Sequence, residues 1–378
     1  MAVTGTDPDT APAAWFHMDA MRTALALVVA FGHLWGLLIE DYAGSQSIPV
    51  RAAYFLAGFA HSAVILFFVL SGYWITRSVV ARAGRGWSWS GYLTDRLARL
   101  GIVLVPALAL GGLLDWIAYY PLNLATHHDL THAWVLTQDL SHSLTPTALA
   151  GNLLFLQHLF VPPFGSNGPL WSLAFEFWYY LWFPALWLSL TRRRLSLALP
   201  VLLITLANPE LAFGFLSWMC GALLYFAEQR ARRARWQAPN WAAPLAALLC
   251  LAALVWGRTG DFSIEDPLEA ACFALFLFTL LRSTPRRWSV LRPFAAYGAR
   301  ASFSLYATHF PVTAFVAGLA VGDRRWAIDA EALAVAAGIL VLVVSVGWGF
   351  AALTEAHTGS LRRWLHSRIA RTGTGQAA

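Results

Sequence analysis

The chain has 378 residues, of which 58% are hydrophobic and only 12% are charged. Soluble globular proteins carry about 25% charged residues, so this composition excludes an ordinary soluble protein and predicts a polytopic membrane protein. The formal net charge is +6, and all 26 basic residues are arginine. These arginines form short clusters between long apolar runs, which is typical of membrane-protein loops, so we expect no nucleic-acid partner.

The chain divides into three regions by composition. Residues 1–14 are polar, acidic and rich in Pro and Thr, which predicts a disordered leader. A membrane domain is expected over residues 15–355, followed by a basic cytoplasmic tail at 356–378. Apolar runs in the middle region predict an all-α fold with about ten transmembrane helices. They cover residues 22–39, 54–75, 101–120, 169–190, two stretches flanking 208–210, 242–257, 268–281, 301–321 and 332–353.

The arginines also predict the orientation of these spans. With ten spans, all but four of the 26 arginines lie on the same side as the amino terminus. The positive-inside rule therefore predicts that both termini are cytoplasmic, in a multi-pass protein of the inner (cytoplasmic) membrane. The long segment at 120–168 falls on the outer side, and its apolar patch at 152–160 is too short to span, which leaves a re-entrant or an interfacial segment.

The first apolar stretch holds two candidate functional residues. Arg22 and His33 lie eleven residues apart, or about 16 Å along a helix. If the arginine lies at the membrane surface, the histidine lies near the middle of a hydrocarbon layer about 30 Å thick. An ionisable group at that depth is costly, so a functional role is one interpretation of His33. A neutral histidine hydrogen-bonded to a neighbouring helix is the other.

Two further spans carry polar or small residues. Ser71 and Gly72 follow an aromatic pair in the second span, where small residues serve close helix packing or a narrow slot for a thin ligand. Glu176 lies inside the fourth span, where a carboxylate costs several kcal/mol unless it is protonated, paired or facing water. We expect either a functional carboxylate or a structural ion pair with an arginine or histidine of another span.

Spacing groups two more pairs of side chains. Arg96 and Arg99 share one helical face at the start of the third span. This arrangement suits contacts with phosphate or with anionic lipid headgroups, and it is equally explained by the positive charge that sets the membrane topology. Tyr306 and His309 share a face of the ninth span. Interhelical hydrogen bonds explain this second pair as well as a substrate contact does.

The polar residues fall within five motifs: DAMR with His33 eleven residues after its arginine, FFVLSGYWI, DRLARLGIVLVPAL, GPLWSLAFEFWYYLWFP and SFSLYATHFP. Their order resembles that of the membrane-bound acyltransferase family 3. This family contains bacterial O-acyltransferases that act on lipopolysaccharide, exopolysaccharide, peptidoglycan and macrolide antibiotics. The resemblance covers roughly residues 15–355. Many members have Asp-Gly-Leu-Arg at the first motif, where this chain has Asp19, Ala20, Met21 and Arg22.

The resemblance implies a reaction and roles for the motif residues. An acyl group would pass from cytoplasmic acyl-coenzyme A to a hydroxyl, often on the outer side. His33 would be the catalytic base or an acyl carrier, and Glu176 would orient the acceptor or tune the histidine. The donor would be bound by Arg22, Arg96 and Arg99 at its phosphates and by Ser71 and Gly72 along its pantetheine arm. Candidate substrate-binding residues are Asp19, Trp171, Tyr306 and His309.

We therefore expect an integral-membrane O-acyltransferase that uses acyl-CoA, with acetyl-CoA as the expected donor. The expected acceptor is a hydroxyl of a glycan or a secondary metabolite, and the other partners are membrane lipids and, for handover outside the cytoplasm, a separate protein. No metal cofactor is expected, because His128 and His132 of the outer segment lack an identifiable third ligand. The alternative is a transporter that exports a small anionic or acylated molecule without chemistry, although no internal repeat supports it. The oligomeric state stays open.

Overall fold

The structure, a computed structural model, describes residues 13–44, 47–192, 203, 208–258, 263–283 and 292–374. Every regular element in these ranges is a helix, and the only strand-like features there are two isolated β-bridges, Ile39 with Trp326 and Gln157 with Val161. The predicted all-α fold is confirmed. Most of the predicted leader and the predicted span that precedes residues 208–210 lie outside the described residues.

Six helices of the described residues are long and apolar enough to cross a membrane, which makes the chain a multi-pass membrane protein. They match the first, second, third, sixth, ninth and tenth predicted spans. These helices are α1 (Ala13–Leu38), α3 (Ala60–Ala83), α4 (Trp89–Tyr119), α8 (Pro209–Arg233), α11 (Arg292–Val321) and α12 (Ala330–Leu353).

Three other predicted spans form α6 (Trp171–Arg192), α9 (Ala242–Trp256) and α10 (Glu265–Leu281). α9 and α10 have 15 and 17 residues, so each reaches only about 22–26 Å, less than the hydrocarbon thickness of about 30 Å.

The second predicted span begins too early in the sequence. Residues 54–57 belong to a separate short helix, α2 (Ile48–Ala57), which ends at Gly58. The next long helix, α3, starts only at Ala60. The hydropathy of 54–75 is continuous across this break, so composition alone could not locate it.

Local sequence signals explain where several helices begin. The side chains of Ser88 and Asp329 accept hydrogen bonds from the first turns of α4 and α12. Asn208 caps α8, and a proline follows it in the first helical position. Such caps satisfy amide groups that have no partner inside the helix, so these polar residues fix the helix starts between apolar runs.

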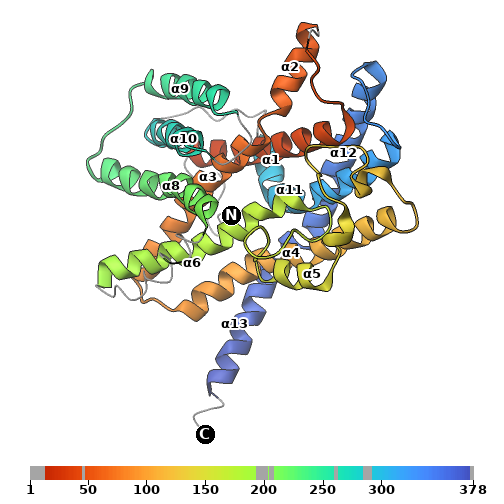
Figure 1. Cartoon of the computed structure of the whole chain (residues 1–378). Helices are drawn as coiled ribbons and strands as arrows, with labels where there is room; N and C mark the ends of the chain where they lie inside the picture. The colour runs from red at the N-terminus through yellow and green to blue at the C-terminus, as the bar shows by residue number, and fades with distance from the viewer. Residues whose placement is uncertain are drawn as a thin grey trace. The chain divides into compact units, whose positions relative to one another are not determined.

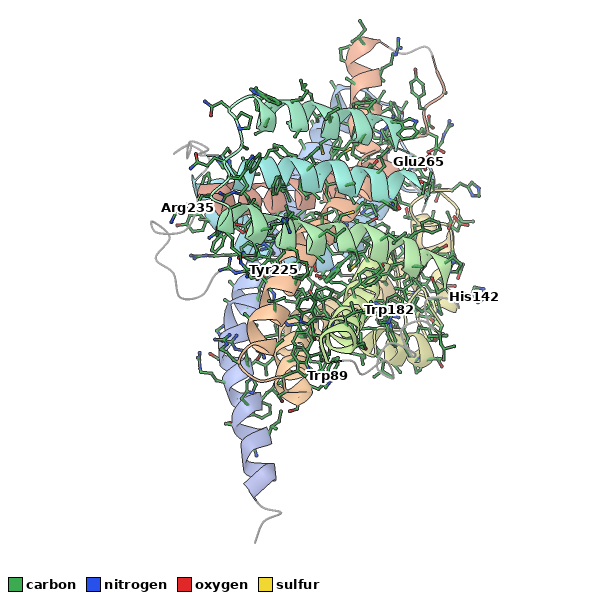
Figure 2. All side chains as sticks on the ribbon, turned by 90° about the vertical axis from the view of Figure 1, so that its left-hand side faces the viewer. Trp89, His142, Trp182, Tyr225, Arg235 and Glu265 are labelled. Carbon is green, nitrogen blue, oxygen red and sulfur yellow. The ribbon has the colours of Figure 1, made fainter. Side chains whose placement is uncertain are left out.

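The described chain forms two compact units. The first unit comprises Met1–Gly32, Gln46–Gly84 and Ser172–Ala299. Within it α8 packs against α3 and α10, and α10 packs against α9, as Figure 1 shows. In Figure 2, α8, α10 and α9 lie one above another, with Tyr225 labelled on α8 and Glu265 at the start of α10.

The second unit comprises His33–Ser45, Arg85–Trp171 and Arg300–Ala378. Its last helix, α13 (Thr358–Thr374), packs against α4, and both are seen in Figure 1. Between α4 and α6 the chain forms no long helix. It is built from α5 (Pro146–Leu153) and the 3-10 turns Ala125–His128, Leu140–His142 and Gly168–Leu170. We call residues 120–170 the outer segment, after the side that the arginine distribution predicts for it.

An apolar core of the second unit joins the outer segment to α1 and α11. Leu37 of α1 and Phe310 of α11 pack in one buried cluster with Ala133, Leu136 and Leu140 of the outer segment. Leu37 is four residues after His33, and Phe310 follows His309. The outer segment therefore covers the part of the unit that holds both histidines.

Candidate active site

Two histidines from distant parts of the sequence form a hydrogen-bonded pair in the second unit. Nδ1 of His33 on α1 lies 2.8 Å from Nε2 of His309 on α11. The two rings are stacked, with centroids 5.1 Å apart and planes inclined by 19°. His309 is only 1% exposed, whereas His33 is half-buried. The structure thus joins the predicted catalytic residue to one of the four predicted substrate-binding residues.

The hydrogen-bond partners determine which ring nitrogens carry protons. Nδ1 of His309 lies 2.7 Å from the carbonyl oxygen of Tyr306, which can only accept, so His309 is protonated at Nδ1. In a neutral His309 the other nitrogen, Nε2, is then an acceptor, and His33 must donate to it from Nδ1. The remaining nitrogen, Nε2 of His33, is left with a free lone pair. An imidazole in this tautomer can take up a proton or attack a carbonyl carbon.

Hydrogen bonds tie the turn of α11 that carries His309 to the outer segment. The hydroxyl of Tyr306 donates to the carbonyl of Pro169 over 2.8 Å. The side-chain amide of Asn167 donates to the carbonyl of Ala307 over 2.9 Å. Because Tyr306 uses its hydroxyl in this bond and its carbonyl in the bond to His309, its contacts position the histidine.

Trp171 immediately follows this stretch of the outer segment. Its ring centroid lies 6.3 Å from that of His158, and the residue is half-buried. Trp171 belongs to the same unit as His33 and His309.

Arg325 fixes the carboxyl end of α1 a short distance beyond His33. This residue lies between α11 and α12, is 8% exposed, and donates to the carbonyls of Gly36 and Ile39 at the end of α1. It also donates to the carbonyls of Thr131 and His132 in the outer segment. The guanidinium satisfies carbonyls that the end of a helix leaves without partners and holds the outer segment against it.

The predicted phosphate-binding arginines lie near the amino end of α4, in the second unit. Arg99 forms an ion pair with Glu355, with 2.7 Å between Nη2 and Oε1. The other carboxylate oxygen of Glu355 accepts hydrogen bonds from the amide and the hydroxyl of Ser304. Arg96 is buried, with its guanidinium 5.5 Å from the ring centre of Tyr92. Arg99 thus has a structural partner, Glu355, that no motif or spacing predicts.

Glu176 and Ser71 lie together in the first unit. The Ser71 hydroxyl donates to Oε1 of Glu176 over 2.6 Å, and the Tyr180 hydroxyl donates to the same oxygen over 2.5 Å. The indole of Trp218 donates to Ser71 over 3.3 Å. Two hydroxyls therefore orient the Glu176 carboxylate, where an arginine or a histidine was expected. Tyr180 is four residues after Glu176 on the same helix face, so helical spacing could have identified it.

Gly72 lies where α3 and α8 come closest. A Cβ atom at Gly72 would fall on the carbonyl oxygen of Trp218, and one at Gly221 of α8 would fall on the carbonyl oxygen of Val69. Only residues without a side chain permit this approach of two helix backbones. Helix packing, one of the two interpretations of Gly72, accounts for its position.

Asp19 and Arg22 form an ion pair on α1, with 3.8 Å between Oδ1 and Nη1. The next residue, Thr23, donates to the carbonyl of Phe294. A Cβ atom at Gly298 would meet the Thr23 side chain. This part of α1 therefore packs closely against the start of α11, within the first unit.

The predicted site residues thus belong to both units. Asp19, Arg22, Ser71, Gly72 and Glu176 lie in the first unit. The second unit holds His33, Arg96, Arg99, Trp171, Tyr306 and His309. In the outer segment His128 contacts Asp139 over 3.3 Å. Over the described ranges no three or more His, Cys, Asp or Glu side chains gather as metal ligands.

The sequence was compared with models of protein families, with curated proteins and with solved structures. Residues 15–353 match a family model described as an acyltransferase domain. No curated protein and no solved structure gave a match. The matched range contains the six long apolar helices up to the end of α12 as well as the His33–His309 pair. Because the match extends over nearly the entire chain, this multi-pass membrane protein belongs to acyltransferase family 3.

Proposed function

We propose that the protein is an O-acyltransferase of the inner membrane that transfers an acyl group, acetyl in the simplest case, from acyl-CoA to a hydroxyl of a glycan or a secondary metabolite. The observation that supports it best is the His33–His309 hydrogen bond, because it leaves Nε2 of His33 as a free base. Family membership supports acyl transfer in general, and the donor and acceptor classes are our proposal.

In the proposed reaction His33 acts as general base and then as general acid. Its Nε2 takes the proton of the acceptor hydroxyl while the hydroxyl oxygen attacks the thioester carbonyl carbon. The C–S bond then breaks, and the departing thiolate takes the proton from His33, so that the products are an ester and free coenzyme A. His309 supports this cycle, because its Nε2 accepts a hydrogen bond from Nδ1 of His33. This bond stabilises the His33 imidazolium that forms.

Arg96 is proposed to bind the donor phosphates, since a guanidinium suits bidentate contact with phosphate. Arg96→Ala should raise the apparent KM for acyl-CoA more than it lowers kcat. An unchanged KM would remove Arg96 from the donor site. Arg22 is proposed to contact the donor and Glu176 the acceptor. Glu176→Gln tests the role of the carboxylate, because it should change the KM for the acceptor more than it changes kcat.

The function is tested by the mass of glycans and small molecules from cells that express the protein or its His33→Ala variant. We expect products heavier by one acyl group only with the wild type. With purified protein and the acceptor so identified, His33→Ala should lower release of free thiol from acetyl-CoA by about 10²–10⁴-fold. His142→Ala, at an exposed histidine of the outer segment, is the matched control and should retain activity.

A transporter would give a different result in this experiment. It would change the distribution of molecules across the membrane but would add no acyl mass and release no thiol. Wild-type activity in His33→Ala, at equal amounts of protein in the membrane, would contradict the role of His33 while leaving acyl transfer intact.

A further inference from the structure

The last helix, α13, has a composition unlike that of the membrane-spanning helices. Residues Thr358–Thr374 include four arginines and no acidic residue. The helix combines charged arginine side chains with the large apolar side chains of tryptophan and isoleucine. This combination is typical of helices that lie at a membrane surface.

One face of α13 is already occupied within the second unit. His366 lies 2.8 Å from the Asp95 carboxylate of α4, and Arg362 lies 4.0 Å from the same oxygen. Leu365, three residues after Arg362 and therefore on the same side of the helix, is half-buried. These contacts fix the rotation of α13 about its axis, so they also determine which residues face away from α4.

The opposite face is exposed and basic. Trp364 lies two residues after Arg362 and two before His366, so it points away from the α4 contact, and Arg363 lies at the border between the contact and the exposed side. Both are exposed, Trp364 by 53%. The guanidinium of Arg368 lies 5.4 Å from the ring centre of Trp364 and is also exposed. A stacked arginine and tryptophan beside a further arginine present positive charge and an amphipathic ring together.

The position of α13 in the chain keeps its first turn close to the bilayer. The spanning helix α12 ends at Leu353, and α13 begins at Thr358 after one 3-10 turn, Glu355–His357. Four connecting residues reach at most about 14 Å even when extended. The start of α13 therefore cannot leave the membrane surface, where anionic headgroups attract arginine and the interface accommodates tryptophan.

We propose that the exposed face of α13, formed by Arg363, Trp364 and Arg368, binds the headgroups of anionic phospholipids. Charge complementarity identifies this partner, because the face carries positive charge only and lipid phosphate is the anion permanently present at the membrane surface, where α13 begins. The lipid-binding face is separate from the His33–His309 pair and does not depend on the proposed reaction.

A label on the exposed face tests the proposal with the full-length protein. Ser367→Cys is introduced after Cys220, Cys250 and Cys272 are replaced by alanine, and the thiol is labelled with a polarity-sensitive dye. The protein is placed in nanodiscs of phosphatidylcholine with 0–50% phosphatidylglycerol. We expect the emission to shift to the blue as phosphatidylglycerol increases and to return in 0.5 M salt.

Variants separate charge from structure in this measurement. Arg363→Gln with Arg368→Gln should weaken the response by about fivefold for each arginine removed, whereas the corresponding lysine variants should keep it. A dye at Ser141→Cys in the outer segment is the control and should not respond to lipid charge. The proposal would be overturned if the emission were the same with and without phosphatidylglycerol. It would also be overturned if the double glutamine variant showed the same blue shift as the protein with both arginines. A shift in pure phosphatidylcholine produced by free inorganic phosphate would overturn it as well, since that result would identify a soluble anion as the ligand.

Discussion

The Arg99 guanidinium lies 2.7 Å from the carboxylate of Glu355, a residue that is itself almost fully buried. The contact gives Arg99 a structural role, whereas its motif implies a role in binding the donor. A single substitution cannot distinguish the two, because removal of Arg99 leaves a buried carboxylate without its cation.

A double substitution separates them. Arg99→Gln alone should destabilise the protein by about 3 kcal/mol, measured as a fall in the thermal unfolding midpoint. Adding Glu355→Gln should restore most of this stability, since the amide needs no cation. If Arg99 also binds phosphate, the double variant keeps a raised KM for acyl-CoA. A double variant with the wild-type KM would show that the residue is structural only.

His309 should act on the reaction through His33. His309→Ala removes the acceptor of the His33 Nδ1 proton, and we expect kcat to fall by roughly 100-fold with little change in the KM for acyl-CoA. His309→Gln should retain more activity, because its amide oxygen reaches a position close to that of Nε2. Steady-state kinetics of the three proteins checks this order. Equal loss in both variants would mean that His309 acts by packing alone.

Gly72 should be required for stability rather than for chemistry. Gly72→Ala places a methyl group on the Trp218 carbonyl and forces α3 and α8 apart, at a cost of about 1–3 kcal/mol. Gly101→Ala in α4 is the matched control, because a Cβ atom there meets nothing within 4 Å. That change should be neutral or stabilise the helix by up to about 1 kcal/mol. Thermal unfolding in detergent measures both, and a stable Gly72→Ala protein would contradict the packing.

The Asp41–Arg325 ion pair should make stability depend on pH. The hydrogen bond from Arg325 lowers the pKa of Asp41 below its ordinary value of 3.8, and this outweighs a partial burial that raises it. The ionised form is therefore favoured in the folded state. Its contribution is complete above the ordinary pKa and is lost as the pH falls through the lower pKa of the folded protein. Asp41 is 63% exposed, so we expect less than about 1 kcal/mol.

Two substitutions check this contribution. Asp41→Asn should unfold at a slightly lower temperature than the wild type at pH 7, and the difference should shrink below about pH 4. Arg325→Ala should cost at least about 3 kcal/mol at every pH, because four backbone carbonyls lose a buried donor as well. If both variants showed the same pH-dependent loss, the carbonyl contacts of Arg325 would have no energetic weight.

Sequence patterns predicted the helical architecture well because hydropathy acts over short distances. The runs that became α1, α4 and α12 were identified from composition, whereas the caps Asn208 and Asp329 were found only in the structure. The break at Gly58 was missed, since both of its sides are apolar. The outer segment was recognised as non-spanning, but its turns have no periodic pattern from which to predict them.

The candidate site was predicted as a set of residues but not as a set of contacts. Motifs identified His33, His309, Ser71 and Glu176, yet nothing in the sequence pairs the first two or the last two. The partners Glu355 and Arg325 were missed for the same reason, because long-range packing determines which polar side chains meet. Tyr180 is the exception, since its spacing from Glu176 is local.

The sequence separation of the histidine pair has a consequence for biogenesis. His33 and His309 are 276 positions apart, so at about 5–20 residues per second the ribosome needs on the order of half a minute to supply the second after the first. During that interval α1 is inserted with the imidazole of His33 lacking its final partner. The pair cannot form in a nascent chain that ends before α11. If His33 and His309 act as proposed, competence for acyl transfer is acquired late in translation, as a property of the nearly finished polypeptide.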